Sequence, residues 1–153
     1  MEQPETNRRD QFELARLKQF DDLLEQGKFV ELRTALQAYE DRAAVELRGY
    51  GYGAAVHLNH TYRGLMALAE GDPQRAKLEL VKSGAVVRSL LLGVVGPNMR
   101  LAKALMQRGE RSAVVEFIDR LGKIWYLPFR LPKVRRWKAA IARGETPDFG
   151  RQL

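Results

Sequence analysis

Histidine is the side chain in this sequence best suited to proton transfer, and its only two copies, His57 and His60, lie three residues apart. That spacing places both imidazoles on the same face of a helix. One hypothesis is a small-molecule-binding protein or an enzyme, in which both histidines share a polar pocket with Asn59 and Asn98. In an enzyme, one histidine is expected to act there as general acid or base. The alternative is that both histidines fill hydrogen-bonded positions between helices and carry no chemistry.

No metal site is predicted at these histidines. A catalytic metal needs at least one further ligand, commonly a carboxylate, and the sequence contains neither an H-E-x-x-H nor a Glu-x-x-His pattern. Because the chain has no cysteine, disulfides, thiolate zinc sites, iron–sulfur clusters and cysteine nucleophiles are excluded. No Ser-His-Asp set or spaced carboxylate pair can be assigned, and no cofactor is predicted.

Two tyrosines alternate with glycines in the run Gly49-Tyr50-Gly51-Tyr52-Gly53. Glycine weakens helices, so this run is expected to separate two helices and to place both tyrosines at the lip of the histidine pocket. The alternative is a permissive loop whose tyrosines only cover apolar surface. A dinucleotide-binding loop is excluded, because that motif follows a strand and this run follows a predicted helix.

The positive charge of the chain is concentrated near its C-terminal end. Residues 1–119 hold 17 basic and 17 acidic side chains, whereas residues 120–144 hold eight basic and no acidic ones. The eight cations are Arg120, Lys123, Arg130, Lys133, Arg135, Arg136, Lys138 and Arg143, and they alternate with Trp125, Tyr126, Phe129 and Trp137. This composition predicts an anionic partner, which is nucleic acid, an acidic protein or anionic lipid. The alternative is a terminal helix that only caps the fold.

The segment 85–95 is apolar over most of its length. It is too short to cross a bilayer and too apolar to lie free in water. One expectation is that it folds into the core of its own chain. The other is self-association, because closed two-fold dimers are the commonest soluble assembly. A homodimer is predicted, with an interface formed by Leu90, Leu91, Leu92, Val94 and Val95.

Helices must position these candidate sites, because apolar residues recur with helical periodicity over nearly the whole chain. The predicted fold class is all-α, with helices over residues 8–26, 29–47, 54–70, 97–108, 112–125 and 132–143. One further helix starts at Pro73 with Asp72 as its cap. Pro128 and Pro132 are expected to bracket the last connection. A chain of 153 residues is long enough to bury a core as a single domain, residues 1–153.

Three predicted hairpin turns share one form, with Gly27, Gly71 or Gly109 directly after the first helix. Glycine is expected there because such a helix ends in a left-handed conformation. An apolar pair follows each glycine five and nine residues later and is expected to dock the second helix on the first. These pairs are Leu32 and Leu36, Ala76 and Leu80, and Val114 and Ile118. The recurrence predicts a repeat of helical hairpins.

In residues 57–90 the chain resembles the tetratricopeptide (TPR) family, since Gly64, Gly71, Ala76 and Leu80 lie where that family has its small, turn, small and large packing residues. The chain departs from the family at His60, Arg63, Ala67 and Arg88, which take the places of the usual Trp, Leu, Tyr and Pro. The turn glycines, counted on to Gly144, are 44, 38 and 35 residues apart, against about 34 in the family. The run Gly96-Pro97-Asn98-Met99-Arg100-Leu101-Ala102 also resembles small bacterial TPR-like proteins.

The resemblance implies a right-handed solenoid of about three helical hairpins with a C-terminal capping helix. It also implies a protein-interaction module that binds a protein or peptide partner in a concave groove. The expected groove positions are Leu58, Thr61, Leu65 and Leu68, and their apolar character favours an apolar or helical ligand segment. A cytoplasmic location is expected, because the N-terminus is charged and lacks the apolar region of a targeting signal.

Overall fold

The computed structural model describes residues 5–153, with side chains from Ala15 onward except that of Arg151. Over this part of the chain it contains eight α-helices, two short 3-10 helices and no β-strand. The predicted all-α class is therefore confirmed. The chain divides into two compact units, Met1–Ala38 and Tyr39–Leu153, and the boundary between them falls inside the second helix.

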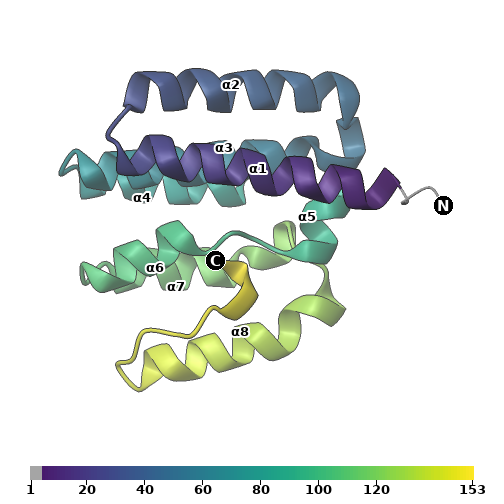
Figure 1. Cartoon of the computed structure of the whole chain (residues 1–153). Coiled ribbons are helices and arrows are strands. Elements are labelled where there is room, and N and C mark those ends of the chain that lie inside the picture. The colour runs from purple at the N-terminus through teal and green to yellow at the C-terminus, as the bar shows by residue number, and fades with distance from the viewer. Residues whose placement is uncertain (1–4) are drawn as a thin grey trace. The chain divides into compact units, whose positions relative to one another are not determined.

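The first unit is a hairpin formed by α1 (Glu5–Glu25) and the first half of α2 (Phe29–Glu46) (Figure 1). Phe20 of α1 is buried, and so are Leu32 and Leu36 of α2. The two leucines occupy the positions five and nine residues after Gly27 that were expected to dock the second helix on the first.

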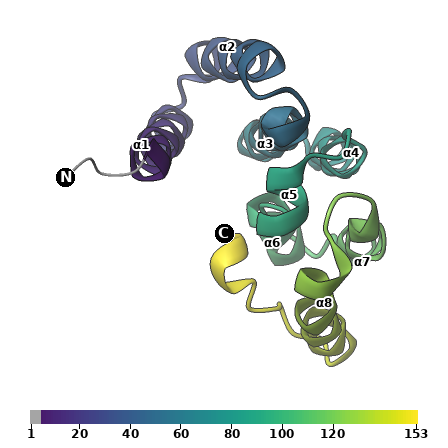
Figure 2. The same ribbon diagram turned by 90° about the vertical axis from the view of Figure 1, so that its right-hand side faces the viewer.

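The second unit begins in the second half of α2 and contains a series of further helices. They are α3 (Arg48–Ala69), α4 (Pro73–Gly84), α5 (Leu90–Val95), α6 (Arg100–Gln107), α7 (Arg111–Asp119) and α8 (Leu127–Ala142). Within this unit α3 pairs with α4 as one hairpin, α6 pairs with α7 as the next, and α8 lies beside α7 (Figure 2). Two 3-10 turns complete the unit, Leu121–Lys123 before α8 and Gly150–Gln152 close to the C-terminus.

The core of the second unit extends from the end of α3 to Phe149. Trp125 and Trp137 are both buried in it, with ring centroids 5.7 Å apart, and Phe149 packs edge-on against Trp137 at 5.0 Å. The buried Gln152 amide donates hydrogen bonds to the carbonyls of Val95 (3.0 Å) and Pro97 (2.9 Å). The C-terminal segment is thereby anchored to the connection between α5 and α6.

The hairpin turns repeat one hydrogen-bonding pattern. Gly27, Gly71, Gly109 and Gly144 all have positive φ, between 69° and 81°. After each of them the next backbone N–H donates to a carbonyl five residues back, which is the helix-ending Schellman arrangement. The apolar pairs that follow the first three glycines are buried at every position. The predicted left-handed turns and docking pairs are therefore confirmed as local features of the fold.

Several expectations about helix boundaries are wrong. The helix expected over residues 112–125 ends at Asp119, and the 3-10 turn Leu121–Lys123 follows it. The run from Gly49 to Gly53 does not separate two helices, because α3 begins at Arg48 and includes it. Pro128 and Pro132 do not bracket a connection either, since Pro128 lies in the first turn of α8 and Pro132 lies inside that helix. Proline is tolerated in a first turn, where its missing N–H has no helical acceptor.

The apolar segment 85–95, called the insert below, is partly irregular and partly helical. It leaves the end of α4, continues without helix and then forms α5. Ser89 caps this short helix by accepting a hydrogen bond from the Leu92 N–H, and Gly96, with φ of 88°, ends it. The short helix is thereby capped at both ends.

Candidate functional site

One face of α3 is built for close contact with the chain that follows it. Gly53, His57 and Gly64 share this face by helical spacing. A Cβ at Gly53 would lie 2.0 Å from the carbonyl oxygen of Val87, and one at Gly64 would lie 2.2 Å from Leu101 Cδ2. The glycines thus allow a close approach to the α3 backbone, by the Val87 backbone at Gly53 and by the Leu101 side chain at Gly64.

His57 lies between these two glycines and joins three segments of the second unit. Its Nδ1–H donates to the carbonyl of Ser83 at the end of α4 (2.8 Å), and its Nε2 accepts from the backbone N–H of Asn98 (2.8 Å). The imidazole is 3% exposed. Burial lowers the pKa of His57 to about 4, and the bond to Ser83 only partly opposes that effect. His57 is thus neutral at pH 7, and both of its ring nitrogens are occupied by backbone groups.

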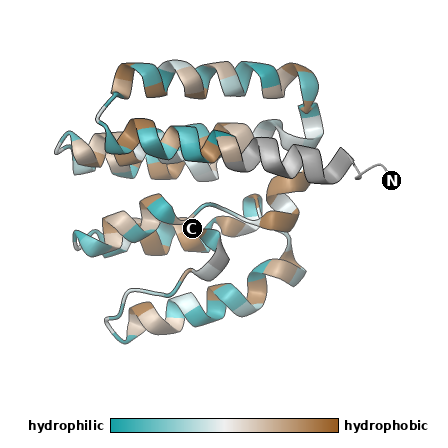
Figure 3. Ribbon diagram, viewed as in Figure 1, coloured by the Kyte–Doolittle hydropathy of each residue, from teal (hydrophilic) through white to brown (hydrophobic). Residues whose placement is uncertain are grey.

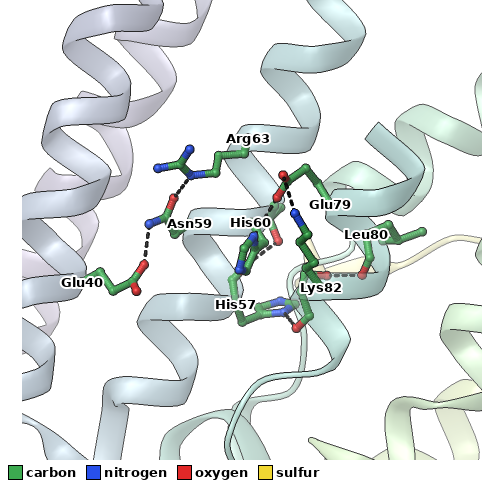
Figure 4. Close-up of polar contacts among 10 residues, drawn as sticks. Glu40, His57, Asn59, His60, Arg63, Glu79, Leu80 and Lys82 are labelled. Carbon is green, nitrogen blue, oxygen red and sulfur yellow. Dashed lines mark hydrogen bonds and ion pairs between the residues drawn. The ribbon is translucent and has the colours of Figure 1, made fainter. Parts of the chain in front are cut away.

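His60 forms a second polar contact, between α3 and α4 (Figure 4). Its Nδ1 lies 2.7 Å from the Glu79 carboxylate, and Lys82 Nζ lies 3.7 Å from the same group. Burial alone would raise the pKa of Glu79, but the hydrogen bond from His60 and the neighbouring charges of His60, Lys82 and Arg63 outweigh it and hold this pKa below its ordinary value. The carboxylate orients the imidazole and directs the other ring nitrogen, Nε2, away from Glu79.

An open groove with a volume of about 310 Å³ lies beside this pair. Three of its side chains follow α3 in four-residue steps, and the others come from the end of α4 and the insert. The lining residues are Tyr52, Val56, His60, Lys82, Ala85, Val86 and Val87. The lining is mostly apolar, with one phenol, one imidazole and one ammonium group that are able to form hydrogen bonds.

The structure brings only part of the predicted pocket together. Tyr52 and His60 line the groove, whereas Tyr50 is 49% exposed and is not part of it. Asn59 points to the other side of α3, where it donates to Glu40 and accepts from Arg63 Nε at 2.7 Å (Figure 4).

Asn98 meets His57 through its backbone N–H rather than through its side chain. The Asn98 side-chain oxygen accepts instead from the N–H of Arg100, at 3.0 Å. The structure therefore does not form one polar pocket around both histidines. His57 instead makes buried hydrogen bonds to the backbone of Ser83 and Asn98, which we call the His57 clamp, and His60 lines an open groove.

The α3 positions expected to line a concave groove do not form an open face. Thr61 and Leu68 are buried, and the Thr61 hydroxyl donates to the carbonyl of His57 at 2.9 Å. Leu65 packs against the core and Leu58 is half-buried. The expected groove is wrong for Thr61 and Leu68, because these side chains pack inside the protein.

Sequence reasoning missed Val56, Glu79, Lys82 and the insert residues that complete the groove. The four-residue steps of Tyr52, Val56 and His60 are a signal that was present in the sequence. The partners on α4 had no such signal, because their register against α3 depends on tertiary packing.

The basic segment is divided between the core and the surface. Trp125 and Trp137 are buried and cannot stack on bases, which is the arrangement expected if α8 caps the fold. Some of the cations have local partners: Arg120 pairs with Glu116, Lys138 with Asp119 and Arg143 with Glu145, while Lys133 donates to Gln152 and lies over the Trp125 ring. Lys123, Arg130, Arg135 and Arg136 have no ion pair among the side chains that the structure describes.

The predicted interface residues differ in how far their side chains are exposed. Leu92 is buried in the core at 3% exposure and Leu91 is half-buried. Leu90, Val94 and Val95 are exposed, at 53%, 44% and 58%. One side of the insert therefore enters the core, as one of the two expectations held, and the other side faces outward; the homodimer stays a prediction.

The chain is an all-α protein of helical hairpins, with a mostly apolar groove and a buried histidine clamp. Among the residues described, no group of three or more His, Asp or Glu side chains is placed to hold a metal ion. No helix in the same part of the chain is long and apolar enough to cross a membrane. No protein-family model matches the chain, and no curated protein or solved structure matches it.

Proposed function

We propose that the protein is a non-catalytic, TPR-like interaction module that binds a protein or peptide segment in the groove beside α3. The composition of this groove is the observation that carries the proposal. Its lining is mostly aliphatic, and it is built on a pair of packed helices, which is the type of surface that accepts an apolar peptide segment. The repeated hairpin turns support the likeness to TPR modules.

The state of the two histidines favours binding over catalysis. His57 has both ring nitrogens in bonds to backbone groups, so neither nitrogen is available to a substrate. His60 is oriented by Glu79 beside the groove, but the lining supplies neither a serine nor a cysteine for it to activate. His60, Tyr52 and Lys82 then serve as polar contacts that orient a bound segment.

Peptide selection tests this proposal. Peptides selected from a random display library on the wild-type protein are expected to be apolar and to lose about tenfold in affinity for Val87→Lys, because this change puts a charge at the groove. Val45→Lys is the matched control, since Val45 on α2 is also an exposed valine (72%, against 61% for Val87) but does not line the groove. Affinity is measured by fluorescence anisotropy. Failure to enrich any peptide, or equal affinity for both variants, would contradict the proposal.

A further inference from the structure

Several exposed apolar side chains lie outside the groove, on α5 and on the first turns of α8. They are Leu90, Val94, Val95, Leu127 and Leu131, which are between 42% and 58% exposed. Figure 3 shows that α5 and the start of α8 are among the most hydrophobic parts of this unit. Several exposed apolar side chains on two helices in direct contact favour an interaction site over ordinary exposure of single residues. We call these five residues the α5–α8 surface.

Direct contacts hold the two helices of this surface together. The backbone N–H of Tyr126, the residue before α8, donates to the carbonyl of Gly93 in α5 at 2.9 Å. The Tyr126 ring lies over Gly93 so closely that a Cβ there would be 2.3 Å from its Cζ. The α5–α8 surface is therefore a fixed feature of the second unit.

Cations gather next to this surface. The Arg88 guanidinium lies 5.5 Å from the Tyr126 ring centroid and donates to the carbonyls of Gly122 and Lys123. The Arg130 guanidinium lies over Gly122, in the space where a side chain would project. These groups place positive charge at the turn that leads directly into α8.

Two further cations continue the charge along α8. Arg135 lies one helical turn after Leu131, on the same face, and Arg136 follows it; both are exposed. As noted above, neither has an ion pair among the described side chains. The sequence contains no acidic residue in 80–109 or in 120–144, the two stretches that supply α5 and α8. The charge around the α5–α8 surface is therefore not neutralised by the segments that form it.

We infer that the α5–α8 surface docks the protein on an anionic lipid membrane. Aliphatic side chains enter the boundary between headgroups and acyl chains, while neighbouring arginines bind anionic headgroups. Each contribution is weak alone, and stable attachment needs both. This inference is independent of the peptide groove.

Two other occupants fit the surface less well. A second copy of the chain, the partner expected from the apolar insert, would bring two sets of unpaired cations toward each other. Nucleic acid would match the charge, but the two tryptophans that would stack on bases are buried, and the exposed side chains are mostly aliphatic.

Vesicle co-sedimentation of the full chain tests the inference. Vesicles that contain about one third phosphatidylglycerol in phosphatidylcholine are expected to bind the protein, and pure phosphatidylcholine vesicles are not. Val95→Asp and Leu127→Asp should each weaken partitioning about tenfold, because a carboxylate at either site opposes both insertion and the headgroup charge. Arg135→Gln combined with Arg136→Gln should have a similar effect, and it changes no buried group. Val45→Asp, an exposed valine on α2, is the control and should bind as the wild type does.

Circular dichroism verifies that each variant keeps its helical content. Absence of binding to the anionic vesicles would overturn the inference, and so would equal binding to neutral vesicles. Binding that persists in Val95→Asp, Leu127→Asp and the double arginine variant would also overturn it. Sedimentation equilibrium without lipid gives a further test: a dimer that both aspartate variants dissociate would assign the surface to a second copy and reject membrane docking.

Discussion

Between pH 6.5 and pH 4 the protein is expected to lose about 3 kcal/mol of its free energy of unfolding through His57 alone. The folded state holds this imidazole neutral, since burial lowers its pKa to about 4, whereas the unfolded chain protonates it near 6.5. In this interval the unfolded state binds more protons, so stability falls as the pH falls. The contribution is fully present above pH 6.5 and is lost by pH 4.

Urea denaturation followed by tryptophan fluorescence measures this effect in the relevant unit. Both tryptophans of the chain are buried in the core of the second unit, which also contains His57. His57→Gln is expected to be about 2–4 kcal/mol less stable at pH 7, because buried backbone groups lose their hydrogen-bond partner. Since glutamine does not titrate, position 57 should then contribute no fall in the free energy of unfolding between pH 6.5 and 5. His60→Gln is the control. It should keep the His57-dependent fall in the free energy of unfolding with falling pH, because the His57 clamp remains intact.

The contribution of His57 to stability falls in a different pH range from that of Glu79. Glu79 has a pKa below its ordinary value of 4.5, so its contribution is present above that pH and is lost only as the pH falls through the folded-state pKa. The difference between the wild type and His57→Gln over pH 6.5 to 5 therefore reports on His57. An NMR titration of the wild type should place the His57 midpoint near pH 4. A midpoint near 6.5, or a stability that stays constant across this interval, would show that the imidazole is not buried and neutral.

Gly53→Ala is expected to destabilise the second unit by about 3 kcal/mol. The added methyl group would lie 2.0 Å from the carbonyl oxygen of Val87, and a backbone atom cannot move aside as the end of a flexible side chain can. The segment that follows α4 would have to lift from α3. Because Val87 also lines the peptide groove, the same change should weaken peptide binding.

Gly49→Ala is the matched control for this substitution. Gly49 is also a helical glycine near the start of α3, but a Cβ there meets no atom within 4 Å. Alanine at this position should leave stability unchanged or raise it by up to about 1 kcal/mol, because alanine favours the helix. Urea denaturation compares the two variants. Equal stability of Gly53→Ala and Gly49→Ala would show that Val87 does not cross α3 at Gly53.

The sequence by itself determined the local features of the fold. The helical periodicity, the Asp72 cap and the four turn glycines depend on neighbours within a few residues, so the all-α class and the hairpin turns followed directly from it. The apolar pairs after Gly27, Gly71 and Gly109 were also assigned correctly, because helix geometry fixes which positions face the preceding helix.

Only the tertiary structure decided what the remaining polar and glycine residues do. Local propensity assigns a break to the run from Gly49 to Gly53, but α3 continues through it, and the crossing of Val87 explains the glycine at position 53. Whether His57 or His60 is buried depends on which segments pack on each side of α3. The contacts that decide it come from Ser83, Asn98 and Glu79, between 19 and 41 residues away along the chain. No local pattern specifies contacts over such separations, so tertiary packing alone determines the His57 clamp and the groove.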